Sequence, residues 1–173
     1  MSSEQLIAVA TDALRGLVQA ALPPGTAVIV GLPSPEGQEL SGLSVHLFHV
    51  GVPPVVRAGP PIRVDGRRER PALRLQLDYL VSGLGGEALQ ELGLLGTALQ
   101  ALLDSPVGGR DSIAALLSQP DRLAAMAAGS LTVQWRVLEL PLDQVSAVWL
   151  ASGMRQRGGV FVRAEAVWQA ESA

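Results

Sequence analysis

The sequence predicts an α+β fold, an α/β sandwich in which a mixed, largely antiparallel sheet of about four to five strands packs with about two to three helices. Two observations predict it. Apolar residues occupy every second position in several segments, as in half-buried strands, and recur three or four positions apart in others, as in amphipathic helices. Strand-like segments also follow one another more often than they alternate with helix-like segments, which favours antiparallel pairing over a doubly wound parallel sheet.

Three segments have the spacing of amphipathic helices. The first covers residues 6–21 and ends at Pro23. The second covers about 87–103, where leucines three or four positions apart form a continuous stripe. The third is short, begins after Pro141 and carries Trp149 among its apolar residues.

Five segments are predicted to be strands. The clearest is 71–82, where the leucines and Tyr79 point to one face and polar residues point to the other. We therefore expect one face of the sheet to be covered and the other to meet solvent. Two segments are less clear. Residues 51–70 are a long connection rich in proline and glycine. Residues 111–128 are ambiguous: Ile113, Leu116 and Leu117 suggest a short element, and Pro120 separates it from an Ala-rich turn of helix. The predicted strands are residues 26–30, 43–50, 71–82, 131–137 and 160–168.

Length and composition bound the class of protein. The chain has 173 residues, the size of one ordinary domain, so residues 1–173 are expected to form a single domain that folds alone. It has no cysteine, which excludes disulfides, thiolate metal sites and cysteine nucleophiles. No secretory signal is recognisable, and no apolar run approaches the roughly 20 residues that span a bilayer. We therefore expect a soluble protein that is made in the cytoplasm and does not insert into a membrane.

The charge balance argues against binding to nucleic acid. Thirteen basic residues against 16 acidic ones give a net charge of −3. Aromatic residues make up only 3% of the chain, so there is little to stack on bases. All the basic residues are arginine, and two interpretations stay open: a GC-rich coding bias, or a preference for the bidentate contacts that arginine makes at interfaces.

The most specific motif runs from Gly83 to Ala88 and matches the G-x-G-x-x-A pattern of dinucleotide-binding turns. It follows a predicted strand and precedes a predicted helix, as that motif requires. The acidic residue about 20 positions further on, Asp104, follows a helix instead of ending a second parallel strand. We therefore favour a plain strand-to-helix turn, with a phosphate site at Gly83, Gly85 and Ala88 as the alternative.

No other constellation points to catalysis. His46 and His49 are the only histidines, and three positions apart on one strand they are predicted to point to opposite faces and not to chelate one metal. No serine has the context of a nucleophile elbow. Asp65, Glu69 and Asp78 do not have the spacing of a carboxylate pair or a metal loop. We expect no catalytic residue, no cofactor and no metal site, and hence a protein that is not an enzyme.

One dense cluster of charges lies in the 51–70 connection. It is either a solvated loop tip, whose ion pairs contribute little to stability, or a contact patch for an acidic partner surface. Two further arginines lie just before the last predicted strand and raise the same question. The candidate partner-interface residues are Arg57, Arg63, Arg67, Arg68, Arg70, Arg155 and Arg157.

Four blocks of sequence are similar, in matching order, to blocks of a known family. They are LSVHLFHVGVPPVVR (43–57), PALRLQLDYLVSG (71–83), ELGLLGTALQALLDSP (91–106) and LDQVSAVWLA (142–151). Together with the helix that bears Trp149 before a closing strand, they resemble the cap, or tail-terminator, family of extracellular contractile injection systems. The resemblance runs over nearly the whole chain and is weaker at 51–70 and 108–130.

The resemblance implies a structural role. Members of this family resemble phage tail-completion proteins, small α/β subunits in a hexameric ring that closes the end of the inner tube and sheath distal to the baseplate. It implies contacts with further copies of the chain and with tube and sheath subunits, and no cofactor. Assembly is expected in the cytoplasm, within a phage-tail-like particle that the cell can release. Two alternatives stay open: a small-ligand or nucleotide-binding enzyme that uses the Gly83-x-Gly85 turn, and another particle component such as a baseplate or adaptor protein.

Overall fold

The structure, a computed structural model, describes residues 5–32, 41–53, 63–64, 67–68, 72–126 and 128–170. Helices and strands alternate irregularly along the chain. In order they are α1 Leu6–Ala21, β1 Ala27–Val30, β2 Gly42–Gly51, β3 Arg63–Val64, β4 Arg67–Arg68, β5 Leu73–Gly83, α2 Ala88–Asp104, β6 Val107–Gly109, α3 Arg110–Leu116, α4 Asp121–Ala124, β7 Gly129–Leu138, α5 Leu142–Ser152 and β8 Gly159–Ala170.

Six of the strands form one sheet, in the order β1-β2-β5-β8-β7-β6. β1 runs parallel to β2, and every other neighbouring pair in this sheet is antiparallel. Among the described residues, β3 and β4 pair only with each other. The predicted α+β class with a mixed, largely antiparallel sheet is confirmed. The main sheet has six strands and the described part of the chain has five helices, more of each than the sequence pattern predicted.

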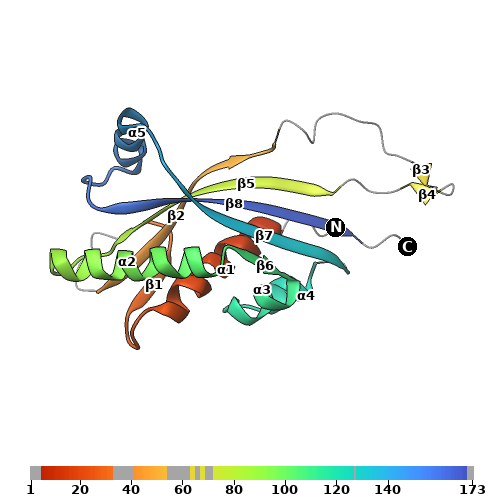
Figure 1. Cartoon of the computed structure of the whole chain (residues 1–173). Helices are drawn as coiled ribbons and strands as arrows, with labels where there is room; N and C mark the ends of the chain where they lie inside the picture. Colours follow the sequence, from red (N-terminus) through yellow and green to blue (C-terminus); the bar gives the residue numbers. More distant parts are fainter. Residues whose placement is uncertain are drawn as a thin grey trace.

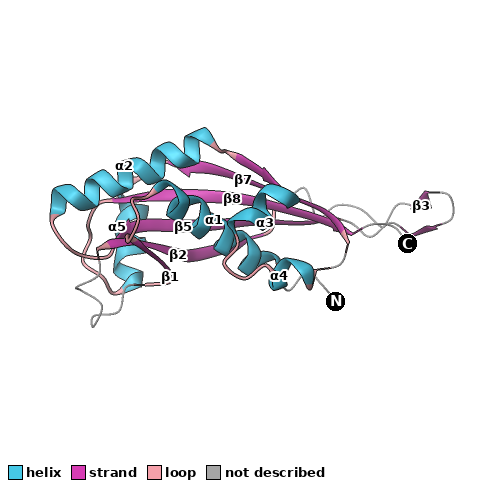
Figure 2. Ribbon diagram, turned by 90° about the horizontal axis from the view of Figure 1, so that it is seen from below, coloured by secondary structure: helices cyan, strands magenta, loops and turns pink. Residues whose placement is uncertain are grey.

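The helices lie on both faces of the sheet. Figure 1 shows the sheet nearly edge-on, with α1, α2, α3 and α4 on one side and α5 on the other side, at one end. Figure 2 looks at the side that carries α1 to α4, where α2 runs along the β7 edge and β1 lies at the opposite edge. In the part of the chain that the structure describes, no helix is long and apolar enough to cross a membrane.

The main core lies between α1 to α4 and the sheet. Leu14 of α1 and Leu77, Tyr79 and Val81 of β5 are fully buried there, which is the face that the alternation of β5 predicts. The buried hydroxyl of Tyr79 shares a 3.0 Å hydrogen bond with Thr11 Oγ1, so it is not left unsatisfied. Burial also raises the pKa of Tyr79, which keeps the phenol neutral.

A smaller second core lies on the opposite face, under α5. It is built on Leu80 of β5, Trp149 of α5 and Phe161 of β8, all largely buried. Phe48 of β2 adds an edge-to-face contact with Phe161, with ring centroids 6.0 Å apart. The expectation that this face meets only solvent is therefore wrong at one end, because α5 folds back over it.

Candidate interaction surfaces

The turn from Gly83 to Ala88 does join a strand to a helix, but the protein's own carboxylates occupy it. The side chain of Glu87 accepts hydrogen bonds from the backbone N–H groups of Leu89 and Gln90, at 3.1 and 3.0 Å. Those free N–H groups at the start of a helix are what a phosphate would bind. Because Glu87 already satisfies them with a negative charge, the turn is built as a helix cap.

Glu91 closes the same turn from the other side. A side chain at Gly83 would collide with its carboxylate, since an added Cβ would lie 2.5 to 2.8 Å from the carboxyl atoms of Glu91. Gly86 has a φ of 123°, a backbone conformation that only glycine adopts easily, so it is needed for the turn itself. The glycines of the motif therefore have local structural roles, and two acidic side chains lie where an anion would have to approach.

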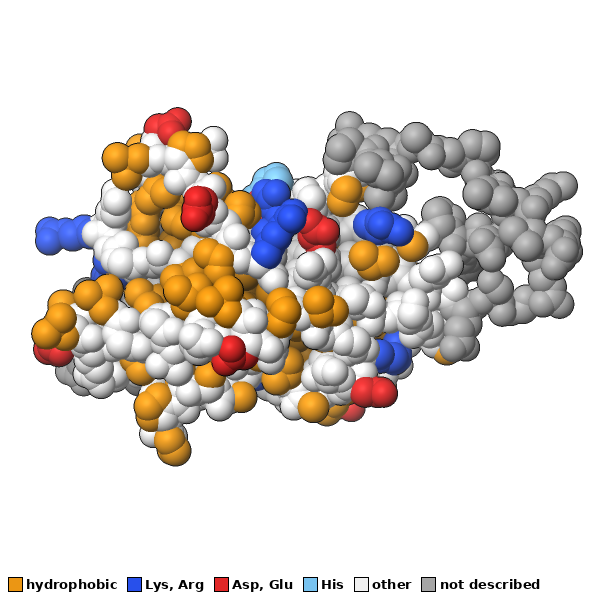
Figure 3. Space-filling view, in the orientation of Figure 1, with side chains coloured by type: hydrophobic (Ala, Val, Ile, Leu, Met, Phe, Trp, Pro, Cys, Tyr) orange, Lys and Arg blue, Asp and Glu red, His pale blue; other side chains and the backbone are white. Residues whose placement is uncertain are grey.

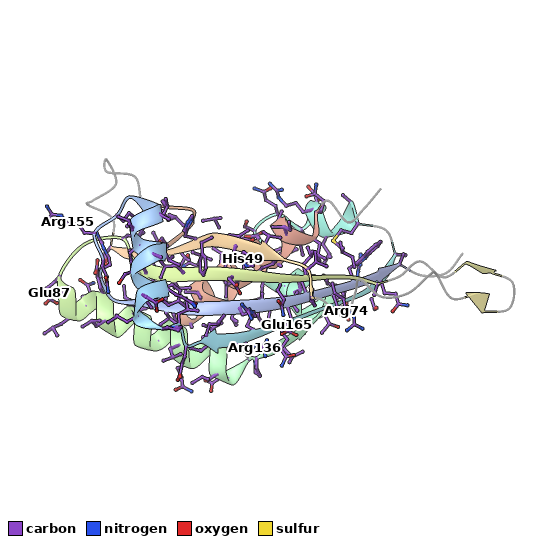
Figure 4. The ribbon with its side chains drawn as sticks, turned by 90° about the horizontal axis from the view of Figure 1, so that it is seen from above. His49, Arg74, Glu87, Arg136, Arg155 and Glu165 are labelled. Carbon is purple, nitrogen blue, oxygen red and sulfur yellow. The ribbon has the colours of Figure 1, made fainter. Side chains whose placement is uncertain are left out.

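Arg157, in the loop between α5 and β8, contacts this turn and is held in place. Its guanidinium donates a 3.2 Å hydrogen bond to the carbonyl of Gly83 and lies 3.8 Å from the carboxylate of Glu91. Arg155, two residues earlier, is exposed, and Figure 4 shows it pointing away from the sheet at the end near α5. The two arginines that the sequence grouped together therefore differ in their contacts. Arg157 bonds its loop to the end of β5, whereas Arg155 is exposed.

Of the other candidate arginines, Arg63 lies on β3 and Arg67 and Arg68 lie on β4. Arg63 pairs across the two strands with Arg68, and Val64 pairs with Arg67. Arg57 and Arg70 lie outside the described residues. The prediction that these arginines form a partner interface stays a prediction.

A row of polar side chains crosses the part of the outer sheet face that α5 leaves open (Figure 4). It joins directly opposed residues on four strands: His49 on β2, Asp78 on β5, Arg163 on β8 and Arg136 on β7. Arg163 donates two hydrogen bonds to the Asp78 carboxylate, at 2.6 and 2.9 Å, and His49 Nδ1 lies 3.0 Å from it. Arg136 donates to Glu165 in the next row. The row holds four strands in register, with Arg136 exposed and Glu165 half-buried.

The electrostatics of the row follow from its geometry. Burial alone would raise the pKa of Asp78, but hydrogen bonds from Arg163 and His49 and the positive charge of Arg163 outweigh it and lower that pKa. Arg136 and Arg163 are like charges placed directly opposite, an unfavourable arrangement that the two carboxylates offset. The carboxylate of Asp78 is therefore already engaged by two neighbours and is not a free base.

The predicted orientation of the two histidines is wrong. The register of β2 shifts between Leu47 and His49, so that His46 lies opposite Leu80 and His49 lies opposite Asp78. Since directly opposed residues of an antiparallel pair share a face, this β-bulge places both histidines on the outer face. Among the described residues, no group of three or more histidine, aspartate or glutamate side chains is arranged to hold a metal ion. Nothing in the local sequence signals the bulge.

Two hollows lie on the helix side of the sheet. The larger, about 410 Å³, is lined by apolar side chains of α1, β1 and β2 and by a polar rim that includes Ser118 and Arg122. Asp12 shapes this rim by accepting hydrogen bonds from the backbone N–H of Ser118 at 2.8 Å and from Arg15 at 2.7 Å. The smaller, about 390 Å³, lies between α1, α3 and the start of β6. In the larger hollow Ser118 Oγ also donates to the Asp12 carboxylate, at 2.9 Å. Burial raises the pKa of Asp12, but hydrogen bonds from Arg15 and Ser118 outweigh it and lower that pKa, so the carboxylate is a weak base. Both hollows therefore fit shape recognition better than catalysis.

Comparison with solved structures gives the class of protein that has this fold. The chain matches the sheath/tube terminator of an extracellular contractile injection system, PVC, in its extended state, with a TM-score of 0.65 and 16% identity over 96% of this chain and 57% of that one. It also matches the anti-feeding prophage cap, described as the AFP tube-terminating cap, with a TM-score of 0.62 and 15% identity over 94% of this chain and 54% of that one. The fold is thus that of tube-terminating proteins, and the chain spans little more than half of their length.

The sequence itself shows the family. Residues 10–171 match the family described as the Pvc16 N-terminal domain, which is most of the chain. The chain belongs to this family. No curated protein matches the sequence significantly. The resemblance drawn from the four sequence blocks is therefore confirmed at the level of the family and the fold.

Proposed function

We propose that this chain is a structural subunit of the ring that closes the end of the inner tube and contractile sheath of a phage-tail-like injection particle. The ring, with six copies as the expected number, would end polymerisation and stabilise the particle. The observation that carries the proposal is the family match over residues 10–171, on a fold shared with two tube terminators. The chain would act as one domain, residues 1–173, without a cofactor or a catalytic step.

The geometry supports a role in assembly. A terminator must contact its neighbours around a ring and the layer below it, and it must offer no further site above. β1 and β6 are the edge strands of the sheet, with no described strand on their outer sides, and α5 covers the outer face only at one end. Free strand edges and open sheet faces are the surfaces through which subunits extend or stack on one another. Acidic residues occupy the only motif that suggested small-molecule chemistry.

The candidate arginines fit this role to different extents. Arg155 is the best placed to contact tube or sheath subunits, because it is exposed and points away from the sheet. Arg57, Arg63, Arg67, Arg68 and Arg70 remain candidates for the same surface. We propose Arg157 as a residue that supports the loop beneath Arg155. A matched pair of variants, Arg155→Ala and Arg157→Ala, separates contact from support: the first should weaken particle binding and the second should lower the melting temperature.

Deletion of the gene tests the function directly. Particles purified from the deletion strain should show tubes of uncontrolled or unstable length by electron microscopy, and expression of the wild-type chain should restore a uniform length. Particles that are uniform and stable without the protein would contradict the proposal. Labelling the chain in assembled particles distinguishes the alternatives, because a baseplate or adaptor protein would lie at the opposite end. A rise in melting temperature with added nucleotide would favour the enzyme alternative.

A further inference from the structure

Helix α2 presents an apolar and uncharged side away from the sheet. Leu89, Leu92 and Leu103 are 75%, 54% and 60% exposed on this side. From Leu92 to Leu103 the sequence contains no charged residue. A helix that faces water normally carries charged side chains there, so the composition of this side is that of an interface. The inner side of α2 is already buried in the main core, through Leu94, Leu95, Ala98 and Leu102.

Two glycines lie on the same exposed side. A side-chain carbon added at Gly93 or at Gly96 would meet no atom within 4 Å, so the packing of the chain itself does not require glycine at either position. Glycine inside a helix lowers its stability relative to alanine. Glycines that one copy of the chain does not need are explained if another molecule packs closely against the helix there.

The apolar surface continues from α2 onto the neighbouring edge of the sheet. Val107 of β6 is 54% exposed and Val137 of β7 is 38% exposed. β6 pairs only with residues 132–134 of β7, and the N–H of Trp135 donates to the carbonyl of Pro106. Because backbone groups alternate in direction along a strand, those of Val137 point to the same outer edge, where no described strand pairs with them. Figure 3 shows hydrophobic side chains along α2 and between it and α5.

The opposite edge of the sheet has complementary features. Val30, at the end of β1, is 53% exposed, and Leu32 just beyond it is 39% exposed. β1 is an edge strand with a partner on one side only, among the described residues. The 410 Å³ hollow lies beside it, with Ala8, Val30 and Leu47 as its apolar lining. Figure 2 shows α2 and β1 along opposite edges of the sheet.

We propose that the uncharged rim, meaning the exposed side of α2 with Val107 and Val137, packs against the β1 edge of a second copy of this chain. A leucine of α2 would enter the hollow beside Val30, and Gly93 and Gly96 would let the two copies approach closely. The inference deepens the proposed ring function, on which it rests.

The partner is a copy of the same chain because the two surfaces complement each other on one molecule. One offers projecting leucines beside glycines, and the other offers a hollow with exposed aliphatic side chains. Each also has a free strand edge, so the sheet of one copy can continue into the next. Two different surfaces on opposite edges make a heterologous contact, which repeats from copy to copy and closes into a ring when the rotation allows it.

Cysteine cross-linking tests the contact, because the chain has no cysteine of its own. Leu89→Cys, Leu92→Cys and Leu103→Cys would each be mixed with a Val30→Cys variant and treated with a short bis-maleimide. We expect cross-linked dimers in the mixtures, for at least one α2 position, and a ladder of higher species when both cysteines are in one chain. Equally efficient cross-linking of an α2 variant with itself would show a two-fold contact and overturn the proposal. The absence of cross-links in every mixture would also overturn it.

A glycine replacement separates association from folding. Gly96→Leu should raise the melting temperature of the chain, since leucine is a better helix former and its Cβ would meet no atom within 4 Å. The same change should weaken self-association about tenfold or more, measured by sedimentation, because the added side chain blocks close approach. The control is Leu150→Glu on α5, where the leucine is 83% exposed and lies outside the rim. If Leu150→Glu abolishes association and Gly96→Leu leaves it intact, the contact lies on α5 and the proposal is wrong.

The failure of this inference can be told apart from a failure of the proposed function. If the deletion strain loses length control while Gly96→Leu restores it as well as the wild type does, the function stands and the rim contact is wrong. If the purified chain cross-links through the rim while deletion leaves the particles unchanged, the contact stands and the terminator role is wrong.

Discussion

At the scale of single residues, Asp78 has the most defined role. The residue is 5% exposed, and its carboxylate pairs with Arg163, which has the like charge of Arg136 opposite it on its other side. Asp78→Asn keeps the shape of the side chain and removes its charge. We expect this change to lower the free energy of unfolding by about 1.5–3 kcal/mol, measured by urea denaturation, because charged hydrogen bonds are lost at a buried site. The control is Glu165→Gln, which breaks an exposed pair with Arg136 and should cost less than about 1 kcal/mol.

The lowered pKa of Asp78 gives a separate prediction for acid. A carboxylate whose folded-state pKa lies below its unfolded value stabilises the protein above the unfolded value, which is 3.8 for aspartate here, and loses that contribution as pH falls through the folded value. The stability difference between wild type and Asp78→Asn should therefore shrink as pH falls from about 5 to about 2. Denaturation curves at several pH values measure it. A difference that grows on acidification would mean that the wild-type group is not ionised in the folded state.

The row around Asp78 was only partly predictable from the sequence. Alternation in β5 placed Asp78 on the polar face, and alternation in β8 does the same for Arg163, because the period of a regular strand is fixed. The contribution of His49 was not predictable. A bulge shifts the register of β2 by one residue, and the shift is decided by pairing with β5 and by the packing of Phe48 on Phe161, which no local pattern records.

At the scale of elements, the start of α2 depends on one side chain. Glu87 is the residue that caps the N–H groups of Leu89 and Gln90. Glu87→Ala should lower the free energy of unfolding by about 1 kcal/mol, as other losses of a helix cap do, and thermal denaturation measures it. Glu87→Gln keeps an oxygen acceptor, so its free energy of unfolding should fall by less. If both variants were as stable as the wild type, the cap would contribute nothing and the turn would need another explanation.

Long elements with a clear period were predicted within a few residues, and so was the short β1, whereas β6, α3 and α4 were not. α1 and α2 each bury one continuous apolar stripe, so their periodicity marks them. β6 has three residues, two of them glycine, and it is a strand only because it pairs with β7. α3 and α4 have seven and four residues, too few for a helical period to be read from them.

At the scale of the whole molecule, the two faces of the sheet are covered unequally. The main core holds four helices and most of the buried side chains, whereas the second core rests on α5 and three largely buried residues. The sequence predicted the first core from the apolar face of β5. It did not predict the second, because Leu80 and Phe161 share their faces with Asp78, Arg163 and Glu165, and the charged residues dominate the pattern. Which part of this mixed face is buried depends on where α5 packs, and tertiary contacts decide that position.

The unequal cores predict that α5 can open without unfolding the rest of the chain. Trp149 is 2% exposed and is the only buried residue of α5, so Trp149→Ala removes most of the contacts that hold this helix on the sheet. We expect the free energy of opening α5 to fall by about 3 kcal/mol, as for other large-to-small changes at an aromatic core residue. In hydrogen exchange, amides of α5 should lose protection while those of α1 and β5 keep theirs. Leu150→Ala, at an exposed position on the same helix, controls for effects on helix propensity. It should leave the amide protection of α5 and that of α1 and β5 unchanged. If α1 and β5 lost as much protection as α5, the two cores would unfold together, and α5 would be an integral part of the fold.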